Sequence, residues 1–306
     1  MTTVPEAESG PAAAWQLLKI TGREWWNDNT FRLAASLAFY TMFSMAPVLL
    51  IATGIASLFL ERETAVTRIV SEVQSLAGAQ GAQAVRQVLQ ASSGFGQGVW
   101  AIATGVITFL LGASVVFAEL QSALNAIWDV EADPKRGVMM GYLLDRLRSF
   151  GIAIGVGFLL LVSLVVSATL SALRDYLNAW MPGVPWLWQT CNVVASFVIV
   201  ALLFAMIYKY LPDVRITWRD VGIGAAVTSA LFTGGKYLIS LYLGQTATAS
   251  AFGAAGSFAV LLIWIYYSAL ISFFGAEFTQ VFARRYGSRI HPDEHAVRVG
   301  RKTDSI

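Results

Sequence analysis

The feature that most constrains the fold of this chain is a series of six apolar segments, each long enough to cross a lipid bilayer. A spanning helix needs about 20 mostly apolar residues to cross about 30 Å of hydrocarbon. Hydrophobic residues make up 56% of the chain and charged residues 13%, whereas soluble domains carry about 25% charged residues. The sequence therefore predicts an all-α fold, a polytopic membrane bundle of six transmembrane helices. The predicted spans are Leu33–Leu60, Val99–Ser122, Phe150–Leu173, Thr190–Leu211, Val221–Leu243 and Ser257–Phe282.

The distribution of Lys and Arg predicts the orientation of this bundle. Sixteen of the 21 basic residues lie in the N-terminal segment, the second-to-third and fourth-to-fifth connections and the C-terminal tail. Because cytoplasmic loops carry the excess of positive charge, both termini are predicted to be cytoplasmic in a multi-pass protein of a bacterial inner membrane. The net charge of +2 is too small to indicate a nucleic-acid partner. On the opposite side lie only Arg62, Arg68, Arg86 and Arg174, while Lys236 falls inside a span.

The segments outside the spans divide the chain into three predicted parts. Residues 1–32 form a cytoplasmic N-terminal segment, residues 33–283 the transmembrane domain, and residues 284–306 a basic cytoplasmic tail that we expect to be disordered. The outer segment 61–98 has apolar residues at helical spacing, which the Ala77–Gly81 stretch is expected to break into two amphipathic helices. Two interpretations remain open for these helices: they lie on the outer membrane surface or they cap the bundle.

Motifs for catalysis, metal binding or nucleotide binding are absent from the sequence. It contains no phosphate-binding loop, no G-x-S-x-G and no H-E-x-x-H motif. The only histidines, His291 and His295, flank Pro292 in the polar tail, and Cys191 is the only cysteine. We therefore expect no enzymatic activity, no cofactor and no metal.

Four blocks of sequence resemble the YihY/BrkB family of bacterial inner-membrane proteins. Together they extend over roughly residues 20–285, and their order and spacing carry the resemblance. It implies six spans but brings no secure activity, since members have been linked to virulence and considered as transporters. The family was once labelled as a ribonuclease, but the carboxylates here are scattered, so we reject that activity. The blocks are Leu33–Pro47 (LAASLAFYTMFSMAP), Leu124–Trp128 (LNAIW), Tyr210–Gly224 and Phe252–Glu277.

Three ionisable residues inside the predicted spans are the strongest functional clues. Burying a charge at the centre of a membrane helix costs at least about 2.5–3.5 kcal/mol. At about 1.5 Å per residue, Glu277 lies roughly 8–10 Å and Glu119 roughly 5 Å inside the cytoplasmic boundary, while Lys236 lies about 24 Å from it. These depths suggest a polar pathway with carboxylates at the inner end and a cation at the outer end.

Three further residues belong to the same candidate pathway. Tyr40 and Arg32 of the first span are predicted to lie in the layer of the two carboxylates, and Asn125 follows the second span. A structural interpretation is equally open: the glutamates pair with arginines or helix ends, Lys236 extends to the interface, and Asn125 caps a helix or bonds to another.

Several glycines in the spans are expected to let helices approach closely. They occur as Gly151-x-x-x-Gly155-x-Gly157, Gly222-x-Gly224 and Gly234-Gly235. Small residues of this kind line helix–helix contacts in membranes.

These observations favour a secondary transporter or lipid translocase that does not use ATP itself. Its partners would be membrane lipids, with an anionic lipid or amphiphile as substrate and Lys236 available for the anionic group. The alternatives are a non-transporting scaffold or envelope-integrity protein, and an intramembrane enzyme using Glu119 and Glu277. The oligomeric state is left open.

Overall fold

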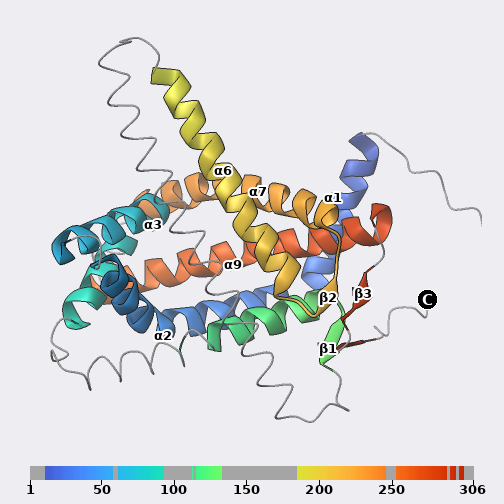
Figure 1. Cartoon of the computed structure of the whole chain (residues 1–306), viewed down its shortest axis with the longest axis horizontal. Coiled ribbons are helices and arrows are strands. Elements are labelled where there is room, and N and C mark those ends of the chain that lie inside the picture. The colour runs from blue at the N-terminus through green and yellow to red at the C-terminus, as the bar shows by residue number, and fades with distance from the viewer. Residues whose placement is uncertain are drawn as a thin grey trace, which may run out of the picture. The chain divides into compact units, whose positions relative to one another are not determined.

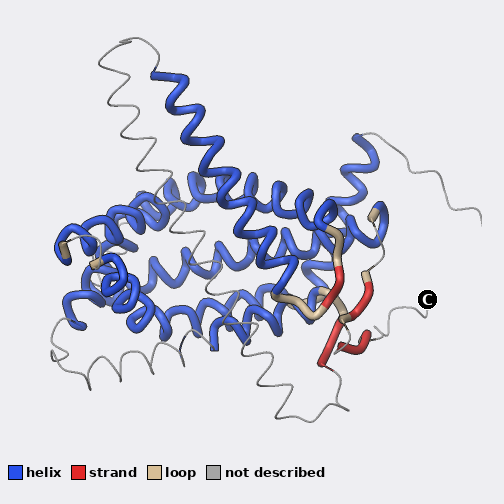
Figure 2. Tube along the Cα trace, in the orientation of Figure 1, coloured by secondary structure: helices blue, strands red, loops and turns tan. Residues whose placement is uncertain are grey.

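The computed structural model describes most of the helices that the sequence predicts. The predicted third span, Phe150–Leu173, and the glycine group Gly151–Gly157 lie outside the described residues. Most of the predicted second span, Val99–Ser122, does so too, since only 112 and 115–122 of it are described. Among the described residues, the strands form two short two-stranded ribbons, each pairing one strand from between the helices with one from the C-terminal tail (Figures 1 and 2). The described residues are 11–57, 61–92, 112, 115–132, 185–245, 253–287, 290–293 and 296–299.

The elements follow one another in an order dominated by long helices. The helices are α1 (Pro11–Asn27), α2 (Thr30–Ala56), α3 (Arg62–Ser92), the helix Val115–Ile127, α6 (Pro185–Tyr210), α7 (Trp218–Gln245) and α9 (Gly253–Tyr286). The strands are β1 (Val130–Ala132), β2 (Val214–Arg215), β3 (His291–Pro292) and β4 (Ala296–Arg298).

The chain divides into two compact units, which are described separately below. The first unit contains Met1–Asn29, Gln121–Leu231 and Ser272–Ile306, and the second contains Thr30–Leu120 and Phe232–Ile271. Helices α7 and α9 are each divided between the two units.

Local sequence explains where several helices begin and end. Asn29 and Asp129 follow α1 and the helix Val115–Ile127 with φ angles of 53° and 55°, and this left-handed conformation is a common helix terminator. Thr217 and Asp220 form a side-chain hydrogen bond of 2.8 Å at the start of α7, in the S/T-x-x-D/E spacing of an N-terminal capping pair. These turns set the direction of the chain next to the candidate site.

In the second unit, α3 packs its apolar face against α2 and α9. Its buried residues include Val70, Val85 and Leu89, and they share a core with Ala38 of α2 and Leu261 of α9. The helix is interrupted at Gly78, whose φ and ψ of 75° and −177° are non-helical. This confirms the break predicted within Ala77–Gly81, and the shared core favours the interpretation that these helices cover the bundle.

In the first unit, α1 and parts of α7 and α9 share a smaller core. Leu17 of α1 is buried with Phe278 and Val281 of α9, and Ile223 and Val227 of α7 pack against them. These contacts hold α1 against the C-terminal part of α9, which also carries the buried polar residues described below.

Two described helices are long and apolar enough to cross a membrane. They contain Val193–Tyr210 of α6 and Ala255–Tyr286 of α9. On α6, Val194, Val198 and Leu202 are about half exposed at every fourth position, so they form one continuous apolar stripe on its surface. Such a stripe is the surface expected of a helix in contact with lipid.

The C-terminal tail departs from the expected disorder. Strand β3 pairs antiparallel with β2, and β4 pairs antiparallel with β1. The pairing satisfies backbone donors and acceptors that a disordered tail would leave to water. An ion pair of 3.0 Å between Arg215 and Asp293 joins the β2–β3 ribbon. Strands of two or three residues are too short to carry a recognisable sequence pattern, which is why the sequence did not indicate them.

Candidate functional site

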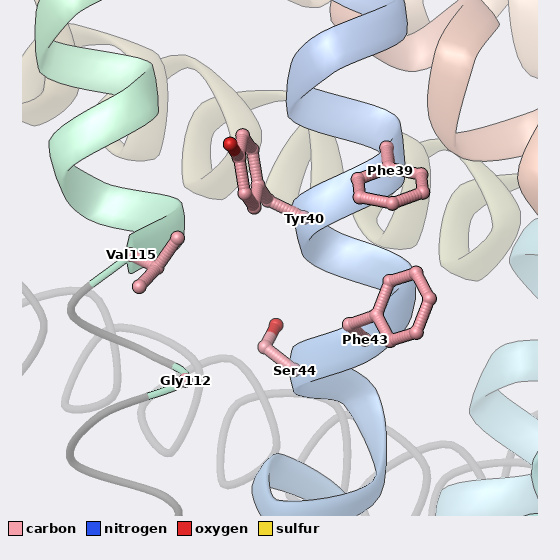
Figure 3. A pocket seen from close by; sticks show the side chains of 6 residues that line it. All are labelled: Phe39, Tyr40, Phe43, Ser44, Gly112 and Val115. Carbon is pink, nitrogen blue, oxygen red and sulfur yellow. The ribbon is translucent and has the colours of Figure 1, made fainter.

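The second unit contains an apolar hollow beside α2 (Figure 3). Its volume is about 330 Å³. Phe39, Tyr40, Phe43 and Ser44 line it from α2, where residues three and four positions apart are neighbours on the helix surface. Gly112 and Val115 line the opposite side, and Figure 3 shows the Val115 and Tyr40 side chains facing each other.

The hollow is mostly aromatic, with two hydroxyl groups. Phe39 contacts both Tyr40, with ring centroids 5.7 Å apart, and Phe43, at 4.7 Å. Phe43 is 72% exposed. Ser44 donates a hydrogen bond of 3.0 Å to the Thr41 carbonyl of its own helix. An apolar lining with a few polar groups is usual for small-molecule sites. This lining suits a ligand that has an apolar chain and a small polar end group.

A buried polar junction joins α6, α7 and α9 in the first unit. Tyr208 of α6 is fully buried, donates a hydrogen bond of 2.6 Å to the Ser272 carbonyl of α9, and lies 3.2 Å from the Thr228 hydroxyl of α7. Thr228 in turn donates to the Gly224 carbonyl at 2.7 Å. Because buried polar groups are costly unless hydrogen-bonded, this junction specifies how the three helices meet.

Two glycine–threonine pairs hold α7 and α9 close together at this junction. A Cβ atom on Gly275 would lie 1.8 Å from the Thr228 hydroxyl oxygen, and one on Gly224 would lie 1.8 Å from that of Thr279. Each helix thus places a threonine against a glycine of the other helix. In both helices the glycine precedes the threonine by four residues. Of the glycines that the sequence singled out, Gly224 and Gly235 make such close approaches, whereas Gly222 and Gly234 face open space.

Glu277 and Gln280 occupy buried positions one turn apart on α9. Their residues are 0% and 1% exposed. Gln280 donates a hydrogen bond of 3.1 Å to Asp129, and the Arg284 guanidinium lies 3.8 Å from the same carboxylate oxygen. A buried carboxyl group in a membrane helix is a functional candidate by default, because its charge is expensive to keep there.

Asp213 anchors the loop between α6 and α7. Asn125 forms two hydrogen bonds with it: the amide donates to Oδ2 at 2.8 Å, and the Asp213 backbone N–H donates to the Asn125 oxygen at 2.9 Å. Gln121 lies 3.3 Å from both carboxylate oxygens, and the Asp293 backbone N–H donates to the Asp213 carbonyl at 2.9 Å. The clamp therefore connects the helix Val115–Ile127 to the α6–α7 loop and the tail.

The structure divides the predicted pathway residues between the two units. Glu277 and Asn125 belong to the first unit, where Glu277 is fully buried and Asn125 forms the clamp with Asp213. The other four belong to the second unit. Tyr40 lines the hollow, Glu119 and Lys236 are half-buried, and Arg32 is exposed. The single pathway joining all three charges stays a prediction.

Sequence reasoning missed the fully buried Tyr208 and the half-buried Asp129 and Asp213, whose side chains hold neighbouring elements together. Asp213 lies inside the Tyr210–Gly224 block that carried the resemblance, and Asp129 directly follows the Leu124–Trp128 block. Their positions in and next to these blocks were the available signal. Among the described residues, no group of three or more His, Cys, Asp and Glu side chains is arranged to hold a metal ion.

A family model described as virulence factor BrkB matches residues 21–299 of the chain. The match covers both units and confirms the resemblance seen in the sequence. No solved structure matches the chain.

Curated relatives carry the name UPF0761 membrane protein. One from Alkalilimnicola ehrlichii is 27% identical over 269 residues, covering 84% of this chain and 56% of the relative. One from Albidiferax ferrireducens is 28% identical over 275 residues, covering 86% and 61%. A third, from Alteromonas mediterranea, is 26% identical over 273 residues, covering 89% and 88%. The chain thus spans less than two thirds of the length of the first two relatives.

Proposed function

Since the chain belongs to the virulence factor BrkB family, whose relatives are named membrane proteins, we propose that it is a transporter. Its substrates would be lipids or other amphiphiles, moved across the membrane without ATP hydrolysis by this chain. The proposal assigns it no enzymatic role. We also propose that the chain forms a bundle of six spanning helices in a bacterial inner membrane.

The observation that carries this proposal is the hollow beside α2. Its volume of about 330 Å³ lies within the range of about 300–1,000 Å³ usual for small-molecule sites. The exposed rings of Phe39 and Phe43 continue its apolar lining onto the helix surface. An acyl chain could therefore enter sideways from the bilayer without leaving an apolar environment, while Tyr40 and Ser44 offer hydroxyls to a polar end.

The charged residues in the helices add support. Glu277 is fully buried in α9 and Lys236 is half-buried in α7. Ionisable groups in membrane helices usually face a bundle interior or a polar cavity and mark transport pathways. Under the proposal, Lys236 attracts the anionic group of the substrate.

The proposed orientation makes a testable prediction about the C-terminus and the α3 segment. With both termini cytoplasmic, alkaline phosphatase fused after Ile306 should be inactive, because the enzyme needs an oxidising compartment. The same reporter inserted after Ala91, at the end of α3, should be active. A reporter that folds in the cytoplasm should give the opposite pattern. Activity of phosphatase at the C-terminus would contradict the orientation.

The transport proposal is tested by lipid translocation in liposomes. The purified protein is reconstituted with fluorescent phosphatidylglycerol, and a membrane-impermeant reductant reports lipid reaching the outer leaflet. We expect the wild type to accelerate translocation over protein-free liposomes. The double variant Lys236→Ala, Glu277→Gln should be slower by about tenfold or more, equivalent to about 1.4 kcal/mol in the barrier.

The matched control removes one cation and one carboxylate from exposed positions. Arg68→Ala with Glu63→Gln on α3 makes the same change in charge, since both residues are exposed, and it should translocate lipid at the wild-type rate. Equal rates for the wild type and protein-free liposomes would refute lipid transport and favour the membrane scaffold. Equal rates for the wild type and the Lys236/Glu277 variant would remove these charges from the pathway.

A further inference from the structure

Helix α1 buries one face among the described residues of the first unit and exposes large apolar side chains on the opposite face. Ala13, Leu17 and Thr21 are buried at every fourth position. Trp15 and Trp26, by contrast, are 60% and 68% exposed. Their separation of eleven residues is three helical turns, so the two indole rings lie on one line along the outer face, about 16 Å apart along the axis.

Basic side chains accompany the exposed tryptophans. Lys19 lies between them on the same line, and its Nζ is 5.3 Å from the centre of the Trp15 ring. Arg23 is also exposed and lies to one side of the line through Trp15, Lys19 and Trp26. Leu18, 41% exposed, lies to the other side of that line. The outer face of α1 thus combines two amphipathic rings, one aliphatic side chain and two cations.

The neighbouring end of α9 adds another cation to the same region. Arg285 donates a hydrogen bond of 3.0 Å to Gln16 of α1 and is itself exposed. This contact belongs to the first unit, in which α1 already packs on α9 through Leu17 and Phe278. The position of the outer face is therefore fixed by packing on its inner side.

We propose that α1 lies in the plane of the membrane interface and binds anionic phospholipid headgroups. Tryptophan rings favour the headgroup level, and two of them at either end of one face hold a helix parallel to the bilayer. Basic residues beside such a face attract anionic lipids. Charge complementarity selects the lipid surface over an apolar protein partner, because Lys19, Arg23 and Arg285 would otherwise be buried without acidic partners.

The test measures immersion of a nitroxide on the outer face of α1 in the full-length protein. Cys191→Ser removes the native thiol, and Gly22→Cys places the label between the tryptophans. Nothing lies within 4 Å of a Cβ at Gly22, so the side chain fits. In nanodiscs, the label should be more accessible to oxygen than to a water-soluble nickel complex. A label at Asn27→Cys, which is exposed away from the line of tryptophans, should show the reverse.

Lipid charge is tested by comparing nanodiscs with and without phosphatidylglycerol. Anionic lipid should raise the ratio of immersed to water-exposed label at position 22 by about fivefold for each basic residue engaged. Lys19→Gln with Arg23→Gln should reduce this increase to the part that Arg285 supplies, whereas Arg62→Gln with Arg68→Gln on α3 should leave it intact. Water-accessible labels at position 22 in both lipids would overturn the interfacial location. Immersion that ignores lipid charge would overturn headgroup recognition.

Discussion

Replacing Gly275 with alanine is expected to separate α7 from α9 and to destabilise the protein by about 3 kcal/mol, the upper end of the cost of overpacking. The new methyl group would lie 1.8 Å from the Thr228 hydroxyl oxygen and 2.7 Å from that of Tyr208. Neither group can retreat cheaply, because both are fully buried and Tyr208 is hydrogen-bonded to Ser272. The melting temperature of the detergent-purified protein should fall by on the order of 10 °C.

Gly222→Ala on α7 is the matched control for this prediction. Nothing lies within 4 Å of a Cβ at Gly222, and alanine is a better helix former than glycine by about 1 kcal/mol. This variant should therefore melt at or slightly above the wild-type temperature. A second variant that combines Gly275→Ala with Thr228→Gly should recover part of the loss, since it removes the side chain that the methyl group meets. If Gly275→Ala melted like Gly222→Ala, the close approach of the two helices would be wrong.

The sequence predicted the elements of this fold better than their contacts. Apolar length and helical spacing are local signals, so they predicted the helical character of α2, α6, α7 and α9 and the break at Gly78. The contacts between helices depend on residues far apart in the chain. The spacing of Gly222 and Gly224 did not reveal which of them meets another helix, because that depends on where Thr279 lies.

The candidate site shows the same limit in physical terms. Glu277 attracted attention because a carboxylate in an apolar segment is costly wherever its partners are. Asn125 was predicted as a cap or an interhelical hydrogen bond, and it does bond across elements, to Asp213 88 positions away. Nothing in the sequence near Asn125 identified that partner. The hollow was equally hidden, since Phe39 and Phe43 look like any other apolar residues of a membrane helix.

Filling the hollow is expected to stop lipid translocation without unfolding the protein. In Ser44→Trp the indole would occupy much of the space of about 330 Å³ that Ser44 faces. Ser44 is 5% exposed, so the substitution costs about 1 kcal/mol for the lost hydrogen bond to the Thr41 carbonyl and about 1–3 kcal/mol for overpacking. This total is below the stability of about 5–15 kcal/mol that is usual for a folded protein. We expect the translocation rate in the liposome assay to fall by about tenfold or more, which is about 1.4 kcal/mol in the barrier.

The control for this substitution places the same side chain outside the hollow's interior. Leu202→Trp on α6 enlarges a side chain that is 48% exposed and is not among the residues that line the hollow, so it should leave translocation within about twofold of the wild type, a change of less than about 0.5 kcal/mol in the barrier. Both variants are compared at equal amounts of monodisperse protein in the liposomes. Unchanged translocation in Ser44→Trp would mean that the substrate does not pass through the hollow. Lys236 and Glu277 are intact in Ser44→Trp. If translocation is lost both in Ser44→Trp and in the Lys236→Ala, Glu277→Gln variant, the hollow would be assigned to the apolar part of the substrate and the two charged residues to its charged part.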